Sequence, residues 1–148
     1  MNTFTIEAIP AGELDELRRI TGADRAEWTA SGGEPIRCCL RDARPGEPLL
    51  LVNYEPPLPA SPYREVGAVF IHPEPCEGPA ENAYPADWIG RPQVLRAYDH
   101  RGWIHPATRT HDGTDPEAVL AAVLGQPGVV QVHSRNIAYG CYMFTAHA

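Results

Sequence analysis

One segment near the C-terminal end, "VHSRNIAYGCYMF" (132–144), gathers the chain's densest set of chemically able side chains. They are His133, Arg135, Asn136, Tyr139 and Cys141. A thiol beside an imidazole and a guanidinium can lose its proton near neutral pH and act as a nucleophile. The same guanidinium, imidazole and phenol, facing one way, would bind a small polar or anionic group. This segment is therefore the first candidate for a site.

A β-hairpin would place these side chains on one surface. We expect residues 129–135 and 139–146 to pair around a loop at 136–138. In that register His133 faces Cys141, with Cβ atoms about 4.5–5.5 Å apart. The neighbouring pairs are Arg135 with Tyr139 and Gln131 with Met143. The opposite face then collects the apolar residues, as a half-buried sheet requires. These are Val130, Val132, Tyr142 and Phe144.

Three functions are compatible with the chain. The first is binding of a small polar or anionic ligand through Arg135, Asn136, Tyr139 and His133. The second is an enzyme for acyl or thiol chemistry, with Cys141 as nucleophile and His133 as base. The third is a protein-interaction module that uses the proline-rich loops. We favour ligand binding, because cysteine usually packs as a small hydrophobic residue and a binding face needs fewer fixed distances than a catalytic dyad.

The other histidines and cysteines match no metal motif. His72 and Cys76 lie close in sequence, as do His105 and His111. Neither spacing is that of a zinc finger, a zinc ribbon or a His-Glu-x-x-His helix, and a metal needs three or four convergent ligands. The neighbouring cysteines at 38–39 are expected on a strand, where adjacent side chains point to opposite faces. The sequence therefore assigns no metal site and names no cofactor.

Hydrophobic periodicity predicts two helices. "AGELDELRRITG" (11–22) has apolar residues at helical spacing. "EAVLAAVL" (117–124) is apolar on nearly all sides and follows a capping box formed by Thr114 and Glu117. A helix this apolar is expected to be largely buried.

Short apolar or alternating runs predict about eight strands. Their ranges are 3–10, 37–42, 49–54, 66–72, 93–99, 102–108, 129–135 and 139–146. The twenty residues from 73 to 92 have no clear period and form either a lid or an insertion held down by Tyr84 and Trp88. Most connections are of hairpin length or rich in proline. We therefore expect an α+β fold, with two helices on a mainly antiparallel, strongly curved sheet or partial barrel.

Composition narrows the class of protein. The 148 residues fit a single globular domain spanning 1–148. All twelve basic residues are arginine, which excludes Schiff-base chemistry and a Walker-type phosphate lysine. The net charge of −7 argues against a nucleic-acid partner, and no apolar run is long enough for a membrane partner. The N-terminal segment lacks the pattern of a signal peptide, so we expect a cytoplasmic protein with free thiols.

Four ordered motifs resemble a known family. They are "RCCLRDARPGEPLLLVNY", "SPYREVGAVFIHPEPC", "LRAYD" and "VHSRNIAYGCYMF", which together span about residues 35–146. They resemble the bacterial family catalogued as domain of unknown function 1203. The family often has Gly-Pro-Ile-Phe where this chain has Gly67-Ala68-Val69-Phe70, and Asn-Ala where it has Asn136-Ile137. The resemblance implies a bacterial protein of about this size but supplies no activity, cofactor or catalytic residue.

Overall fold

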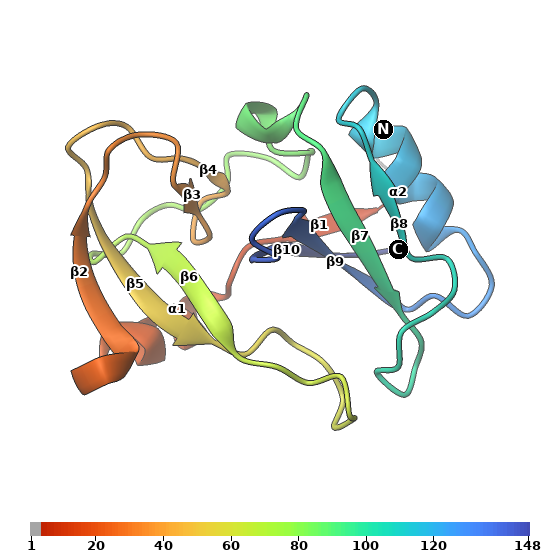
Figure 1. Ribbon diagram of the computed structural model, residues 1–148, viewed down its shortest axis with the longest axis horizontal. Coiled ribbons are helices and arrows are strands. Elements are labelled where there is room, and N and C mark those ends of the chain that lie inside the picture. The colour runs from red at the N-terminus through yellow and green to blue at the C-terminus, as the bar shows by residue number, and fades with distance from the viewer. Residues whose placement is uncertain (1–3) are drawn as a thin grey trace.

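The computed structural model describes residues 4–148, which form two five-stranded β-sheets lying side by side (Figure 1). The strand orders are β1-β10-β9-β7-β8 and β2-β5-β6-β3-β4. The expected α+β class with two α-helices and mainly antiparallel pairing is confirmed. The expected single, strongly curved sheet or partial barrel of about eight strands is wrong, because the described residues hold ten strands in two open sheets.

The first sheet is antiparallel throughout and is covered on one face by a helix. Its strands are β1 (Thr5–Glu7), β10 (Tyr142–His147), β9 (Gln131–Asn136), β7 (Gln93–Tyr98) and β8 (Arg109–His111). The covering helix is α2 (Pro116–Leu124), which lies beside this sheet (Figure 1). Its Leu120 and Val123 are buried in the same core cluster as residues of β7 and β9. Asp115 caps α2 by accepting a hydrogen bond from the Ala118 N–H, one residue later than the cap expected from sequence.

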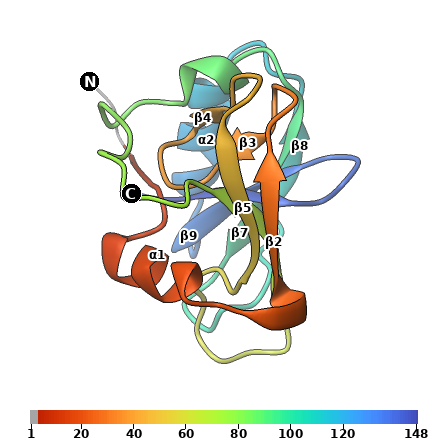
Figure 2. The same cartoon turned by 90° about the vertical axis from the view of Figure 1, so that its left-hand side faces the viewer.

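The second sheet contains one parallel pair. Its strands are β2 (Arg25–Thr29), β5 (Pro48–Tyr54), β6 (Gly67–Ile71), β3 (Pro35–Ile36) and β4 (Arg41–Asp42). β3 runs parallel to β6 through the Ile36–Phe70 pair, and the other neighbours are antiparallel. The helix α1 (Ala11–Arg18) lies beside β5 (Figure 2). Because the two-residue strand β3 runs parallel to β6, the C-terminal ends of both strands lie at the same edge of the sheet.

Several strand predictions need correction. The range 37–42 is not one strand, since a turn at 37–40 separates β3 from β4. The range 102–108 is irregular apart from an isolated bridge between Ile104 and Tyr98, and β8 begins only at Arg109. β2 occupies residues that lie outside every predicted strand. It forms because it pairs along β5, although its own side chains are mostly exposed. Residue 3 of the predicted first strand lies outside the described residues.

Buried polar contacts join the two sheets. The Arg37 side chain is 2 % exposed, and its Nε donates a hydrogen bond to the Tyr142 carbonyl at 2.8 Å. Trp88 lies in the short helix η2 (Ala86–Trp88), stacks on the Phe144 ring and donates from Nε1 to Asp42 Oδ1 at 2.9 Å. The long segment 73–92 is therefore anchored at Trp88, which is fully buried, as in the second of the two alternatives considered for it. Within residues 4–148, no helix has the length and apolarity needed to cross a bilayer.

Candidate metal centre

A tight turn presents two neighbouring cysteines at one edge of the second sheet. Residues 37–40 connect β3 to β4, and the Leu40 N–H donates to the Ile36 carbonyl at 2.9 Å. Leu40 has a positive φ of 54°, which is unusual for a residue with a branched side chain. The backbone is therefore curled here, and the strand rule that sends adjacent side chains to opposite faces does not apply to Cys38 and Cys39.

The parallel pair brings a distant histidine to the same edge. Because β3 and β6 run in the same direction, the residues that follow them emerge together. His72 follows β6 directly, and its backbone N–H donates to Cys38 Sγ at 3.3 Å. Arg18, the last residue of α1, holds the next residues in place by donating to the carbonyls of His72 and Glu74. Cys76 lies just beyond this clamped segment.

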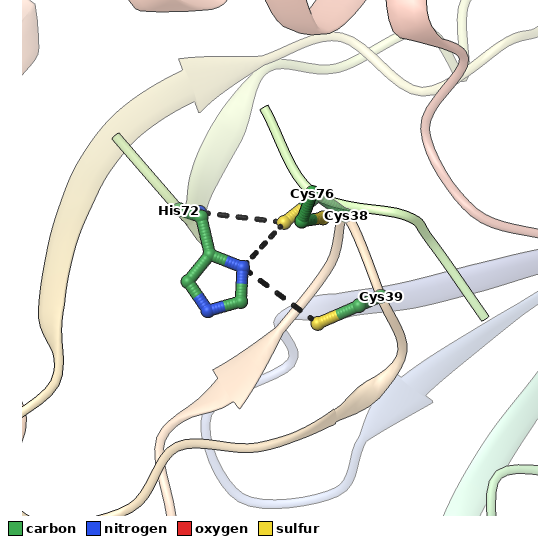
Figure 3. A group of neighbouring side chains, drawn as sticks. All are labelled: Cys38, Cys39, His72 and Cys76. Carbon is green, nitrogen blue, oxygen red and sulfur yellow. Dashed lines mark hydrogen bonds between the residues drawn. The ribbon is translucent and has the colours of Figure 1, made fainter. Parts of the chain in front are cut away.

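The four side chains converge on one point (Figure 3). The Sγ atoms of Cys38, Cys39 and Cys76 and a ring nitrogen of His72 all lie within 4.8 Å of one another. His72 Nδ1 is 3.3 Å from Cys38 Sγ and 3.9 Å from Cys39 Sγ. In a tetrahedral zinc site with Zn–S near 2.3 Å and Zn–N near 2.0 Å, ligand atoms are separated by roughly 3.5–3.8 Å. The observed spacing therefore needs a contraction of about 1 Å at most to reach that geometry.

The four residues of the cluster differ in their exposure to solvent. Cys38 is buried, Cys39 and His72 are partly buried, and Cys76 is exposed. The interaction between the two neighbouring thiols raises the pKa of Cys38, with burial acting in the same direction, and lowers the pKa of Cys39. Partial desolvation by the surrounding groups raises the pKa of Cys76, although its side chain is accessible to solvent. Because Cys38 is buried and Cys76 is exposed, an ion would reach the cluster from the Cys76 side.

An ion pair lies on the far side of the His72 ring. Arg41 NH1 and NH2 donate to Glu47 Oε1 and Oε2 at 2.8 and 2.9 Å. Glu47 Oε2 is 3.1 Å from His72 Nε2. The hydrogen bonds from Arg41 hold the pKa of Glu47 well below its ordinary value, although burial acts against this shift. The Glu47 carboxylate is thus fixed by Arg41 next to His72 Nε2.

Sequence reasoning missed this cluster for a definable reason. It assigned Cys38 and Cys39 to a continuous strand and so separated them, and it had no means of placing β3 parallel to β6. The pair His72 and Cys76 alone offers two ligands, which is too few for a metal motif. The available signal was the combination of a vicinal cysteine pair with a His-x3-Cys segment directly after an apolar strand.

The C-terminal hairpin exists, but its predicted register is wrong. β9 and β10 pair antiparallel with Arg135 opposite Tyr142 and His133 opposite Thr145. The Asn136 N–H donates to the Cys141 carbonyl at 2.9 Å, so the loop is 137–140. A bulge between Tyr142 and Phe144 shifts the alternation. The predicted register required one polar face, whereas both faces of the sheet are largely buried at β9.

His133 lies inside the protein and not on a ligand-facing surface. It is 1 % exposed, and its ring packs against Tyr98 and Tyr142 with centroids 4.7 and 5.4 Å away. Its Nε2 lies 3.1 Å from both the Pro57 carbonyl and Gln131 Oε1. Burial lowers the pKa of His133 to about 4, against the opposing effect of the Pro57 carbonyl. The hairpin thus does not pair His133 with Cys141, and their catalytic roles stay predictions.

Three of the other predicted hairpin residues line a small cavity beside β6. Arg135, Tyr139 and Cys141 line a space of about 230 Å³. Arg135 donates from NH1 to the Gly140 carbonyl at 3.0 Å and forms an ion pair with Glu65. Asn136, the fourth predicted ligand residue, does not line this cavity. The structure therefore groups three of the five predicted site residues and separates His133 and Asn136 from them.

The fold and the clustered donors define an α+β protein with a candidate Cys3His metal centre. The chain belongs to the family described as "Protein of unknown function (DUF1203)", whose family model matches residues 33–147. The resemblance stated from the four motifs is thereby confirmed, and the matched range contains every residue of the cluster and of the hairpin. Comparisons with curated proteins and with solved structures found no match.

Proposed function

We propose that the protein binds one Zn²⁺ ion through Cys38, Cys39, His72 and Cys76. The observation that carries this proposal is the convergence of four ligand atoms, all within 4.8 Å of one another, from segments more than thirty residues apart. Thiolate and imidazole donors suit zinc, and three cysteines with one histidine form a closed structural set. Such an ion would fasten the 37–40 turn to the end of β6 and to the segment that follows it.

Metal content tests the proposal directly. Protein stripped with a chelator and then exposed to zinc should retain one ion per chain, measured by plasma mass spectrometry after desalting. Cobalt substitution should give the near-ultraviolet thiolate bands and strong visible bands of a tetrahedral sulfur-rich site. Serine substitution of Cys38, Cys39 or Cys76 should remove the ion or lower its affinity, and so should His72→Ala.

Cys141→Ser is the matched control, because it removes a cysteine outside the cluster. It should retain one zinc ion and the cobalt spectrum of the wild type. Failure of the wild type to hold zinc would overturn the proposal. Loss of zinc in Cys141→Ser, with retention in Cys38→Ser, would also overturn it.

We further propose that the hairpin cavity binds a small polar or anionic ligand. Supporting this is the cavity of about 230 Å³ lined by Arg135, Tyr139 and Cys141, and the buried Nε of Arg135, which has no hydrogen-bond partner among residues 4–148. The volume lies below the roughly 300–1,000 Å³ of drug-sized pockets, so the ligand must be small. An anion here would compete with Glu65 for the Arg135 guanidinium.

Thermal-shift measurements with phosphate, sulfate and citrate test this second proposal. At least one anion should raise the unfolding temperature of the wild type more than a chloride control of equal ionic strength does. Arg135→Met should abolish that increment, and Arg101→Met, on the exposed Asp99 pair, should keep it. An increment that survives Arg135→Met, or none with any of the three anions, contradicts the proposal.

A further inference from the structure

The second nitrogen of the His72 ring faces an unusually well-fixed carboxylate. Glu47 Oε2 is 3.1 Å from His72 Nε2, and Arg41 holds both carboxylate oxygens. The Arg44 backbone N–H also donates to Glu47 Oε1 at 2.7 Å. With three donors fixing it, the Glu47 carboxylate has little freedom to leave the imidazole.

These contacts indicate which ring nitrogen carries the proton when the His72 imidazole is neutral. His72 Nε2 has two neighbours, the Glu47 carboxylate at 3.1 Å and Arg41 NH2 at 3.5 Å. A carboxylate only accepts hydrogen bonds and a guanidinium only donates them. The carboxylate is nearer, and Arg41 NH2 already donates to it at 2.9 Å. The proton therefore lies on Nε2, which donates to Glu47.

That tautomer leaves the lone pair of Nδ1 directed at the cysteines. Nδ1 is the atom that lies 3.3 Å from Cys38 Sγ and 3.9 Å from Cys39 Sγ (Figure 3). A metal ion needs an unprotonated ring nitrogen, and a carboxylate on the opposite nitrogen fixes the ring orientation and increases the basicity of the ligating nitrogen. The donor set is thus complete on the His72 side before any ion arrives.

We propose that Glu47, held by Arg41, is the positioning residue of the metal centre, and that it makes Nδ1 of His72 the ligating nitrogen. This inference rests on the proposed zinc function of the same site. Removal of such a partner lowers metal affinity by about 10- to 100-fold. Glu47→Gln keeps an oxygen that accepts from Nε2 but loses the charge, so its loss of affinity should be smaller than that of Glu47→Ala.

Two measurements test the proposal. Zinc affinity is measured by competition with a chromophoric chelator for wild type, Glu47→Gln, Glu47→Ala and the control Glu55→Gln, which removes a carboxylate from an exposed pair with Arg64. We expect wild-type affinity for the control, about 10- to 100-fold weaker binding for Glu47→Ala, and an intermediate value for Glu47→Gln. Ring-nitrogen NMR of the ¹¹³Cd-loaded wild type should show cadmium coupled to Nδ1 and a proton on Nε2.

The outcomes separate this inference from the proposed function. A wild type that binds zinc and couples cadmium to Nε2 overturns the positioning role and leaves the metal site intact. Equal zinc affinity of wild type and Glu47→Ala does the same. A wild type that binds neither zinc nor cadmium overturns both. The NMR measurement uses the unaltered protein, so it decides the ligating nitrogen even if Glu47→Ala does not fold.

Discussion

Replacing His133 by glutamine should make the free energy of unfolding fall less steeply as the pH is lowered into the mildly acidic range. His133 is enclosed between the Tyr98 and Tyr142 rings, and its Nδ1 has no hydrogen-bond partner among residues 4–148. Burial lowers its pKa from 6.5 to about 4, the Pro57 carbonyl opposes that shift, and the nearby Arg96 charge adds to it. Glutamine keeps a polar side chain at this position but takes up no proton in the same range.

The direction of this pH effect follows from the difference in proton uptake between the unfolded and the folded protein. Between pH 6.5 and about 4 the unfolded chain protonates this imidazole and the folded protein does not. The stability that neutral His133 confers is therefore complete above pH 6.5 and is lost as the pH falls toward 4. Each unit by which the folded-state pKa lies below the unfolded-state pKa corresponds to about 1.4 kcal/mol, so the full loss of stability is about 3 kcal/mol. That is a large part of the roughly 5–15 kcal/mol that stabilises a typical domain.

Urea unfolding followed by tryptophan fluorescence measures the effect. The free energy of unfolding is determined from pH 7.5 to 4.5, with a chelator present so that metal release does not contribute. The wild type should lose about 2–3 kcal/mol more over this range than His133→Gln does. His100→Gln, which removes an exposed histidine, should keep the wild-type slope. Equal slopes for wild type and His133→Gln would refute the reasoning.

Three further predictions concern metal binding and the junction of the two sheets. Zinc at about a thousand times its dissociation constant should stabilise the chelator-treated protein by about 4 kcal/mol, seen as a rise of about 10 °C in Tm by calorimetry; no rise would contradict a structural ion. Arg37→Lys should lower the free energy of unfolding in urea by about 2–4 kcal/mol, because a lysine cannot reproduce the buried guanidinium contacts with the Tyr142 carbonyl, and an effect below 1 kcal/mol would contradict this account. Trp88→Phe should cost about 2 kcal/mol in the same assay, through loss of the hydrogen bond to Asp42 and of packing volume, and an unchanged midpoint would contradict it.

Elements with local signals were predictable from the sequence. The helix at 116–124 has a capping residue, an early proline and an apolar surface, and these act within one or two turns. The apolar run at 49–54 is short and bounded by turn residues, and it forms a strand with one face buried and the other partly buried. Both were located nearly to the residue, since no distant part of the chain is needed to specify them.

Features that depend on distant contacts were not predictable. β2 is a strand because it pairs with β5, and its own exposed residues carry no alternation. The 37–40 turn requires a positive φ at Leu40, which no residue-type rule indicates. The hairpin register depended on a bulge that pattern counting cannot detect. The metal centre combines the turn with the parallel β3–β6 pair, so it became visible only in three dimensions.

The parallel pairing of β3 with β6 sets an order of events during synthesis. Two parallel strands cannot be joined by a tight hairpin, so the chain between β3 and β6 must return past them, and it forms β4 and β5 on the way. Cys38 and Cys39 precede His72 and Cys76 by more than thirty residues, so they are synthesised first. All four side chains of the cluster exist together only after synthesis has passed Cys76, so the complete donor set cannot form before that point.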